Sequence, residues 1–178
     1  MQGVTTSGAA LVAPGLVRVA GEGLVSLKTH PRLEAFTALL TESGFQSKVV
    51  LDAASLIWSK LVINASINPL TALLNIPNGE LLLRPSAREL MGKLALETAS
   101  VAAAQNIHLS FEDPVQAVEA VALKTSENIS SMLQDIRRGA PSEIDAICGA
   151  IMRAGKALNV ATPLNDVMVS LIKARTKK

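Results

Sequence analysis

The sequence predicts a mainly helical fold with a small α/β part at its start. Glycine and proline punctuate short β-branched stretches over residues 3–28, which is typical of strands joined by turns. A strand-helix-strand pattern follows and ends at Leu51. From Asp52 onward, apolar residues recur with the 3.6-residue period of a helix. The 178 residues are enough for one sizeable core but not for two complete domains. We therefore expect two parts, residues 1–51 and an all-helical part at 52–178.

The first part resembles the end of a larger sheet domain. Leu16 to Val19 is a strand candidate, a helical pattern between Pro31 and Gly44 comes next, and Lys48 to Leu51 is a further strand. One strand-helix-strand fragment cannot bury both faces of a sheet. The chain is therefore expected to begin within a truncated α/β domain.

Six helices are predicted in the second part. Asp52 is expected to cap the first helix and Pro69 to end it, because proline cannot donate a backbone hydrogen bond. Thr162 is expected to cap the last helix, with Pro163 at its first position. The helical segments are 52–69, 85–106, one that starts at Asp113-Pro114, 129–138, 142–159 and 163–174.

Composition excludes several classes of function. Lys and Arg number 17 against 15 Asp and Glu, and there are only three Phe, one Trp and no Tyr on which bases could stack, so no nucleic-acid partner is expected. The only cysteine, Cys148, cannot form an internal disulfide, and two distant histidines give no metal-ligand spacing. No apolar run approaches the roughly 18 residues of a membrane span, and the start lacks the basic region of a secretory signal. We expect a cytoplasmic protein without a metal or membrane partner.

The first helix carries a polar stripe. Lys60, Asn64 and Asn68 are four residues apart, so each is rotated by only about 40° from the last. Asparagine is unfavourable inside a helix because its amide competes with the backbone. The stripe is either a solvent-facing or internally satisfied structural feature, or a lysine and two amides that face a substrate. Spacing alone leaves both interpretations open.

Three further polar segments are candidates. Asn75 to Glu80 contains an Asn-Gly turn, which is often only a turn. Asn128, Ser130 and Ser131 lie where a helix is expected to start, so they can cap it or bind a carboxylate. Glu143 is expected in the first turn of another helix, where the helix dipole favours an acid whether or not it has a function.

Taken together and in this order, these segments resemble the carboxy-terminal part of the ketopantoate reductase family. The similarity covers essentially the whole chain. The segments that carry it are GVTTSGA (3–9), WSKLVINASINPLTALLNIPNGEL (58–81), NISSMLQDIRRG (128–139), PSEIDAICGA (141–150) and TPLN (162–165).

The resemblance implies an oxidoreductase that uses NADPH to reduce 2-dehydropantoate to pantoate in pantothenate and coenzyme A biosynthesis. It also implies a helical domain like the carboxy-terminal domain of 6-phosphogluconate dehydrogenase, preceded by the end of a Rossmann domain. By position, Lys60 is similar to the family's catalytic acid, and Glu143 to its acidic residue where cofactor and substrate meet. Ala9 matches a backbone contact to the cofactor. The residues implied to bind the 2-keto acid are Asn64, Asn68, Asn78, Asn128, Ser130 and Ser131.

The chain departs from the family pattern in two respects, one of which is Cys148 at a position where the family often has asparagine. The other concerns the nucleotide-binding turn. The chain contains no Gly-x-Gly-x-x-Gly turn, which binds the pyrophosphate of a dinucleotide. We therefore expect the chain to be inactive alone and to need the missing amino-terminal Rossmann half or a homodimer partner. It can be a truncated product, an isolated domain or half of a split enzyme. Two other hypotheses are a non-catalytic helical module for binding or dimerisation, and a reductase of a different 2-keto acid.

Overall fold

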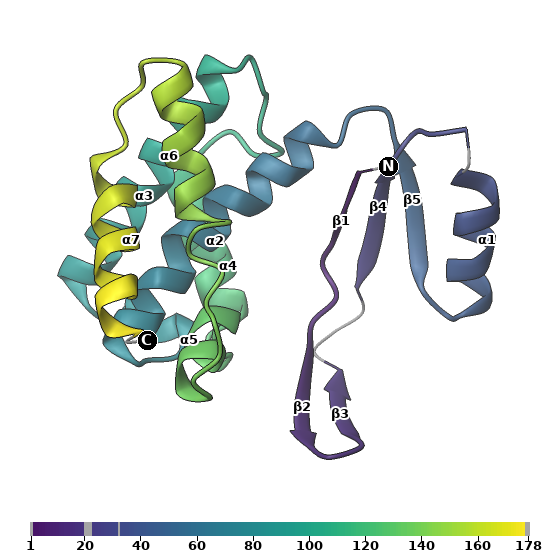
Figure 1. The fold of residues 1–178 in the computed structure, drawn as a ribbon, viewed down its shortest axis with the longest axis horizontal. Helices are drawn as coiled ribbons and strands as arrows, with labels where there is room; N and C mark the ends of the chain where they lie inside the picture. Colours follow the sequence, from purple (N-terminus) through teal and green to yellow (C-terminus); the bar gives the residue numbers. More distant parts are fainter. Residues whose placement is uncertain (1, 20–22, 32, 177–178) are drawn as a thin grey trace. The chain divides into compact units, whose positions relative to one another are not determined.

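The computed structural model describes residues 2–19, 23–31 and 33–176. The chain divides into two compact units, Met1–Ile57 and Trp58–Lys178 (Figure 1). The predicted domain boundary near residue 52 lies close to this division. Among the described residues, no helix combines the length and apolar character needed to cross a membrane.

The first unit is built on a three-stranded sheet with the strand order β1-β4-β5. Strand β1 is antiparallel to β4, whereas β4 and β5 are parallel and are connected through helix α1. A strand-helix-strand unit was predicted here, but its first strand is β4 and not Leu16–Val19, which is β3 of a hairpin. A separate hairpin of β2 and β3 turns at Gly15, whose φ of 78° suits glycine. The bounds are β1 Gly3–Thr5, β2 Ala9–Ala13, β3 Leu16–Val19, β4 Leu24–Lys28, α1 Leu33–Glu42 and β5 Gln46–Val50.

The second unit is helical, and its described residues contain no strand, as the sequence predicts. The Asp52 carboxylate accepts the backbone N–H of Ala54 at 2.9 Å and so starts α2 as expected. Asp113 caps α4 in the same way, through the N–H groups of Val115 and Gln116. The helices are α2 Ala54–Leu74, α3 Pro85–Ala104, α4 Pro114–Lys124, α5 Ser131–Arg137, α6 Cys148–Ala157 and α7 Pro163–Arg175, with a 3₁₀ turn η1 at Asn78–Leu81 (Figure 1).

One hydrophobic core holds these helices together. Helices α2 and α3 contribute fully buried residues to it, and η1, α4, α5, α6 and α7 pack around them. Large side chains that are completely enclosed include Leu81, Met91, Leu94, Leu133 and Ile172. A buried aliphatic side chain of this size contributes about 1.5–3 kcal/mol. The core therefore fixes the positions of the polar segments on α2, η1 and α5.

The prediction that Pro69 ends the first helix was wrong, because α2 continues to Leu74. Proline removes only its own N–H bond, and residues 65–72 are buried without interruption, so packing offsets that loss. The Thr71 hydroxyl also donates to the backbone, with the Ile67 and Asn68 carbonyl oxygens both at 3.0 Å.

One predicted helix start and one predicted side-chain cap were wrong, whereas α7 begins at Pro163 as predicted. Helix α6 begins at Cys148 rather than near residue 142, because Ile144 and Ile147 are both buried and hold residues 143–147 in turns. Glu143 is thus not in the first turn of a helix. At α7, the Thr162 side chain makes no capping hydrogen bond.

The start of α7 is instead capped by Glu97 of α3. Its carboxylate accepts the N–H of Leu164 at 2.9 Å and the N–H of Asn165 at 2.8 Å. It also accepts the side-chain amide of Asn165 at 2.8 Å. A negative carboxylate is favoured at the positive end of a helix.

Candidate functional site

The polar stripe of α2 runs from the protein surface into the core. Lys60 is exposed and Asn64 is half-buried, whereas Asn68 is only 7% exposed. Because consecutive members are one turn apart, this gradient places a cation at the outer end and an amide at the inner end. The stripe is therefore not a uniformly solvent-facing strip.

The inner end of the stripe contacts the start of α5. Thr71, one turn beyond Asn68, is completely buried, and its hydroxyl oxygen lies 2.7 Å from that of Ser130. The Ser130 hydroxyl also accepts the N–H of Leu133 and so caps α5. Either hydroxyl can be the donor in this bond, and donation by Ser130 satisfies both groups because the Thr71 proton then goes to a backbone carbonyl. The hydroxyl of Ser130 is therefore fully used within the protein.

The predicted Asn-Gly turn packs on the same segment. The N–H of Asn78 donates to the carbonyl of Asn128, and that of Gly79 to the carbonyl of Ser126, both at 3.0 Å. A Cβ on Gly79 would lie 2.5 Å from the Cβ of Ser126, so only glycine allows this approach. The turn and the 126–131 segment are thus held together by backbone bonds.

The side-chain amide of Asn78 is buried, and its oxygen, Oδ1, has no hydrogen-bond donor within the part of the chain that the structure describes. Its Nδ2 donates to the Thr125 hydroxyl oxygen at 2.9 Å, and that hydroxyl donates its only proton to the Val121 carbonyl at 2.7 Å. The amide nitrogen must therefore face Thr125, which leaves Oδ1 on the other side. This Oδ1 is buried and has no hydrogen-bond partner among the described residues, and Asn78 as a whole is 8% exposed. This acceptor is enclosed by the protein and stays unsatisfied within the described structure.

The remaining predicted site residues are exposed. Asn128 and Ser131 flank the buried Ser130, and Ser131 is the first residue of α5. Glu143 lies in the turns before α6, where its carbonyl accepts two backbone N–H groups. Ala9 begins β2 in the first unit.

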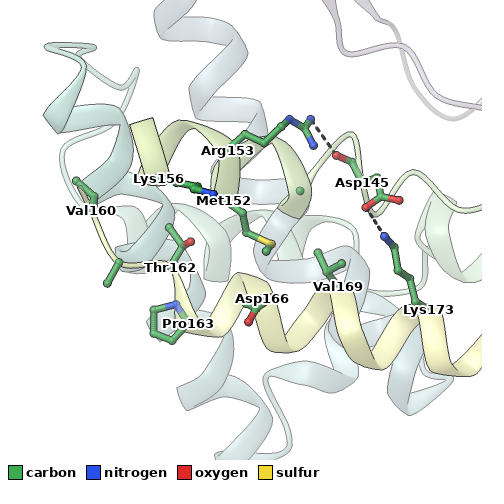
Figure 2. A pocket seen from close by; sticks show the side chains of 12 residues that line it. Asp145, Met152, Arg153, Lys156, Val160, Thr162, Pro163, Asp166, Val169 and Lys173 are labelled. Carbon is green, nitrogen blue, oxygen red and sulfur yellow. Dashed lines mark hydrogen bonds and ion pairs between the residues drawn. The ribbon is translucent and has the colours of Figure 1, made fainter. Parts of the chain in front are cut away.

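The structure brings some of the predicted residues together. A backbone hydrogen bond joins Asn78 to Asn128, and Ser130 contacts Thr71, which follows Asn68 on α2. A pocket of about 650 Å³ between α6 and α7 is lined by none of the predicted site residues (Figure 2).

Two threonines that support these segments, the buried Thr71 and the half-buried Thr125, were missed from the sequence. Thr71 follows Asn68 by three residues on α2. This spacing would have indicated Thr71 if the helix had been predicted to continue past Pro69. Thr125 holds the amide of Asn78 from 47 residues away. No local pattern indicates such a contact.

Gly3 and Gly23, near the start of the chain, each lie close to another segment of the chain. A Cβ on Gly3 would lie 2.7 Å from the Ser26 carbonyl oxygen, and one on Gly23 would lie 1.8 Å from the Ser7 hydroxyl oxygen. The space beside both glycines is therefore filled by the chain itself. These two glycines do not fit the pyrophosphate of a dinucleotide.

Cys148 is not a candidate nucleophile. It is buried at the first position of α6, and burial raises the pKa of its thiol to about 12, with a smaller contribution from the negative charge of Glu97. A thiol becomes a nucleophile as the thiolate, which this environment disfavours.

Comparison with known proteins gives consistent results. Residues 52–176 match the family described as ketopantoate reductase PanE/ApbA C terminal. A 2-dehydropantoate 2-reductase from Pyrobaculum aerophilum is 42% identical over 137 residues, which is 77% of this chain and 49% of that protein. The chain thus spans about half the length of this relative.

Two solved structures are similar over nearly the whole chain. The PanE/ApbA family ketopantoate reductase from Ralstonia eutropha JMP134 superimposes with a TM-score of 0.89 at 28% identity, covering 98% of this chain and 58% of that one. D-mandelate dehydrogenase with NADH and anilino(oxo)acetate gives a TM-score of 0.86 at 31% identity, covering 98% and 59%.

Proposed function

The chain belongs to the ketopantoate reductase family, and on this premise we propose that it forms the substrate domain of an NADPH-dependent 2-dehydropantoate 2-reductase. Residues 52–178 would form this domain, and residues 1–51 the end of a nucleotide-binding domain. The observation that carries the proposal is the contact of three polar segments at one place, where α2, the Asn78 turn and the start of α5 meet. A structural stripe would not require this convergence.

Lys60 is proposed as the proton donor. Reduction of a 2-keto acid at C2 leaves negative charge on the former carbonyl oxygen, and NADPH supplies the hydride. An ammonium at the exposed end of the stripe can stabilise and protonate that oxygen. Glu143 is proposed to favour the charged form of the lysine. Ala9 is proposed to contact the cofactor through its backbone.

The substrate carboxylate needs hydrogen-bond donors. Ser131 offers an exposed hydroxyl, and the amides of Asn64, Asn68 and Asn128 offer N–H groups. Ser130 lies beneath Ser131 with its hydroxyl already used, so we assign it to holding the helix start in place. In this arrangement Ser131 makes the direct contact.

Asn78 is proposed to select the substrate. Its Oδ1 is an acceptor without a donor among the described residues, so it suits the C4 hydroxyl of 2-dehydropantoate rather than a carboxylate. The oxygen is enclosed in this structure, so the proposal requires the Asn78 turn to open when the substrate binds. A site built around a substrate hydroxyl rejects analogues that lack it, because the buried acceptor then stays unsatisfied. This argument favours 2-dehydropantoate over an aryl 2-keto acid.

A second candidate function is reduction of a different 2-keto acid. The similarity to D-mandelate dehydrogenase, at 31% identity, is the observation that favours it. Oxidation of mandelate gives 2-oxo-2-phenylacetate, which has an aromatic ring and no hydroxyl group. The two candidates therefore differ in what they require of Asn78.

The test is a two-part protein in which the amino-terminal portion of the Pyrobaculum relative precedes this chain. We expect oxidation of NADPH in the presence of 2-dehydropantoate, with a kcat/KM at least about tenfold above that for 2-oxo-2-phenylacetate. The opposite preference would support the second candidate. A folded protein that turns over neither compound would support a non-catalytic binding or dimerisation module instead.

A further inference from the structure

Helix α5 is attached to the end of α2 at two points. At the start of α5, the Ser130 hydroxyl oxygen lies 2.7 Å from that of Thr71. At its end, Nε of Arg137 donates to Oδ1 of Asn75 at 3.0 Å. Thr71 lies in the last turn of α2, and Asn75 directly follows that helix. Two attachments fix the direction of α5 relative to α2 as well as its position.

Thr71 lies on the same face of α2 as the residues proposed to act on the substrate. At 100° per residue, Thr71 is rotated by only about 20° from both Lys60 and Asn64. Lys60 is exposed and Asn64 is half-buried, whereas Thr71 is completely buried. The polar face of α2 therefore ends inside the protein in a hydroxyl group that contacts α5.

A chain of hydrogen bonds connects the backbone of α2 with that of α5. The Thr71 hydroxyl lies 3.0 Å from the carbonyl oxygens of Ile67 and Asn68. The Ser130 hydroxyl accepts the N–H of Leu133 at 3.2 Å. The bond between the two hydroxyls joins these two groups, and both side chains are buried. Each hydroxyl thus has a fixed place relative to the helix that carries it.

The position of Ser130 determines that of Ser131. The two residues are consecutive, so their Cα atoms are about 3.8 Å apart. A shift of Ser130 therefore also moves Ser131, to which we assign the substrate carboxylate. A misplacement of about 1 Å at a site that orients a substrate can cost a hundredfold in rate. The Thr71–Ser130 bond is thus placed where its loss affects substrate binding as well as stability.

We propose that Thr71 is a positioning residue for the substrate. Through its hydrogen bond with Ser130, it holds Ser131 at the place relative to Asn64 that binding of the substrate carboxylate requires. Thr71 itself does not contact the substrate. The inference rests on the proposed function, because it concerns the binding of 2-dehydropantoate.

The first test needs no activity and uses the whole 178-residue chain. Hydrogen exchange at the N–H of Leu133 reports on its bond with Ser130. In Thr71→Val, this exchange should be at least about tenfold faster relative to that of Leu94 in the core of α3. Thr71→Ser keeps the hydroxyl and should stay within about threefold of the native ratio. Thr98→Val removes an equally buried hydroxyl on α3 and should leave the ratio unchanged.

The second test is steady-state kinetics in the two-part protein, at a temperature where each variant is folded. Thr71→Val should raise KM for 2-dehydropantoate about five- to tenfold and change kcat less than about twofold. A purely structural role would lower the apparent kcat through the folded fraction and leave KM unchanged. Thr71→Ser should restore KM to nearly the native value. Thr98→Val should leave both constants unchanged.

Each outcome supports or overturns the proposal. Unchanged exchange at Leu133, unchanged KM in a folded Thr71→Val protein, or a raised KM that Thr71→Ser does not restore would overturn it. If Thr71→Val does not fold, Ser130→Ala breaks the same bond while the Thr71 hydroxyl keeps its backbone acceptors. That variant should raise KM by a similar factor, and an unchanged KM would overturn the proposal.

Failure of the proposed function gives a different result. A native two-part protein that is folded but reduces no 2-keto acid would contradict the proposed function and the assignment of Thr71 to substrate binding. Faster exchange at Leu133 in Thr71→Val would then still show that Thr71 holds the start of α5, whereas unchanged exchange would contradict that as well.

Discussion

The hydroxyl groups of Thr71 and Ser130 lie 2.7 Å apart, although 59 residues separate them in the sequence. This contact ties the inner end of the α2 stripe to the first turn of α5. Both side chains are buried, and Ser130 is the residue that caps α5. The exposed Ser131 directly follows Ser130 in the chain, so this bond anchors the residue next to it.

Removing the Thr71 hydroxyl should destabilise the protein. Thr71→Val keeps the side-chain shape but leaves the buried Ser130 hydroxyl without an acceptor, so we expect a loss of about 1–3 kcal/mol in the free energy of unfolding. Urea denaturation measures it. Thr98→Val is the matched control, because Thr98 is equally buried and its hydroxyl has no partner in the described residues. That change should be neutral or stabilising, and equal losses for both variants would contradict the role of the Thr71–Ser130 bond.

The cap of α7 should depend on Glu97 and not on Thr162. Glu97→Ala removes the acceptor of two backbone N–H groups and one side-chain amide, so a loss of about 2–3 kcal/mol is expected. Thr162→Ala should cost less than about 0.5 kcal/mol, since its side chain makes no cap. Thermal or urea unfolding of the two variants gives both values. A larger loss of stability for Thr162→Ala than for Glu97→Ala would instead support the sequence-based prediction that Thr162 caps α7.

Neither of these two contacts could be predicted from the sequence, although much of the surrounding fold could. Helical periodicity and proline positions predicted the helical unit, and the four-residue spacing of Lys60, Asn64 and Asn68 predicted the polar stripe. The role of Thr71 was hidden because Pro69 normally ends a helix, and only burial explains why α2 continues. Glu97 lies 67 residues from the N–H group it binds, so only the packing of α3 beside α7 reveals that bond.

Cys148 should add a pH-dependent contribution to stability. Its pKa is raised from 9.0 to about 12 in the folded protein, chiefly by burial. Between these values the unfolded chain loses the thiol proton while the folded chain keeps it, so the contribution is complete below pH 9 and is lost toward pH 12. The slope is at most about 1.4 kcal/mol per pH unit. Unfolding measured at several pH values should show this slope in the native sequence and not in Cys148→Ala. Identical slopes would contradict the assignment.

The chain without added residues should bind NADPH weakly. The phosphate-binding turn supplies much of a dinucleotide's affinity, and the sequence given contains no Gly-x-Gly-x-x-Gly motif. Calorimetric titration should give a dissociation constant weaker than about 0.1 mM, equivalent to roughly 5.5 kcal/mol of binding free energy. Micromolar or tighter binding would show that the cofactor is held without a phosphate-binding turn.

The central claim is that the α2 stripe, together with the start of α5, forms a catalytic surface. It predicts how activity depends on Asn64 of α2 and Ser131 of α5 as well as on Lys60. In the two-part protein, Asn64→Ala and Ser131→Ala should raise KM for 2-dehydropantoate with smaller effects on kcat, because both are assigned to binding the substrate. If the stripe is structural, the same variants should lower the melting temperature and reduce activity only through the folded fraction.

The most direct measurement is kcat of Lys60→Ala in the two-part protein, with its melting temperature determined on the same sample. The Lys60 side chain is exposed, so the melting temperature should stay nearly unchanged. Loss of the proton donor should lower kcat about 10²- to 10⁴-fold. Lys60→Arg, which keeps the positive charge but donates a proton poorly, should not restore the rate. A Lys60→Ala protein with near-normal kcat would contradict the account.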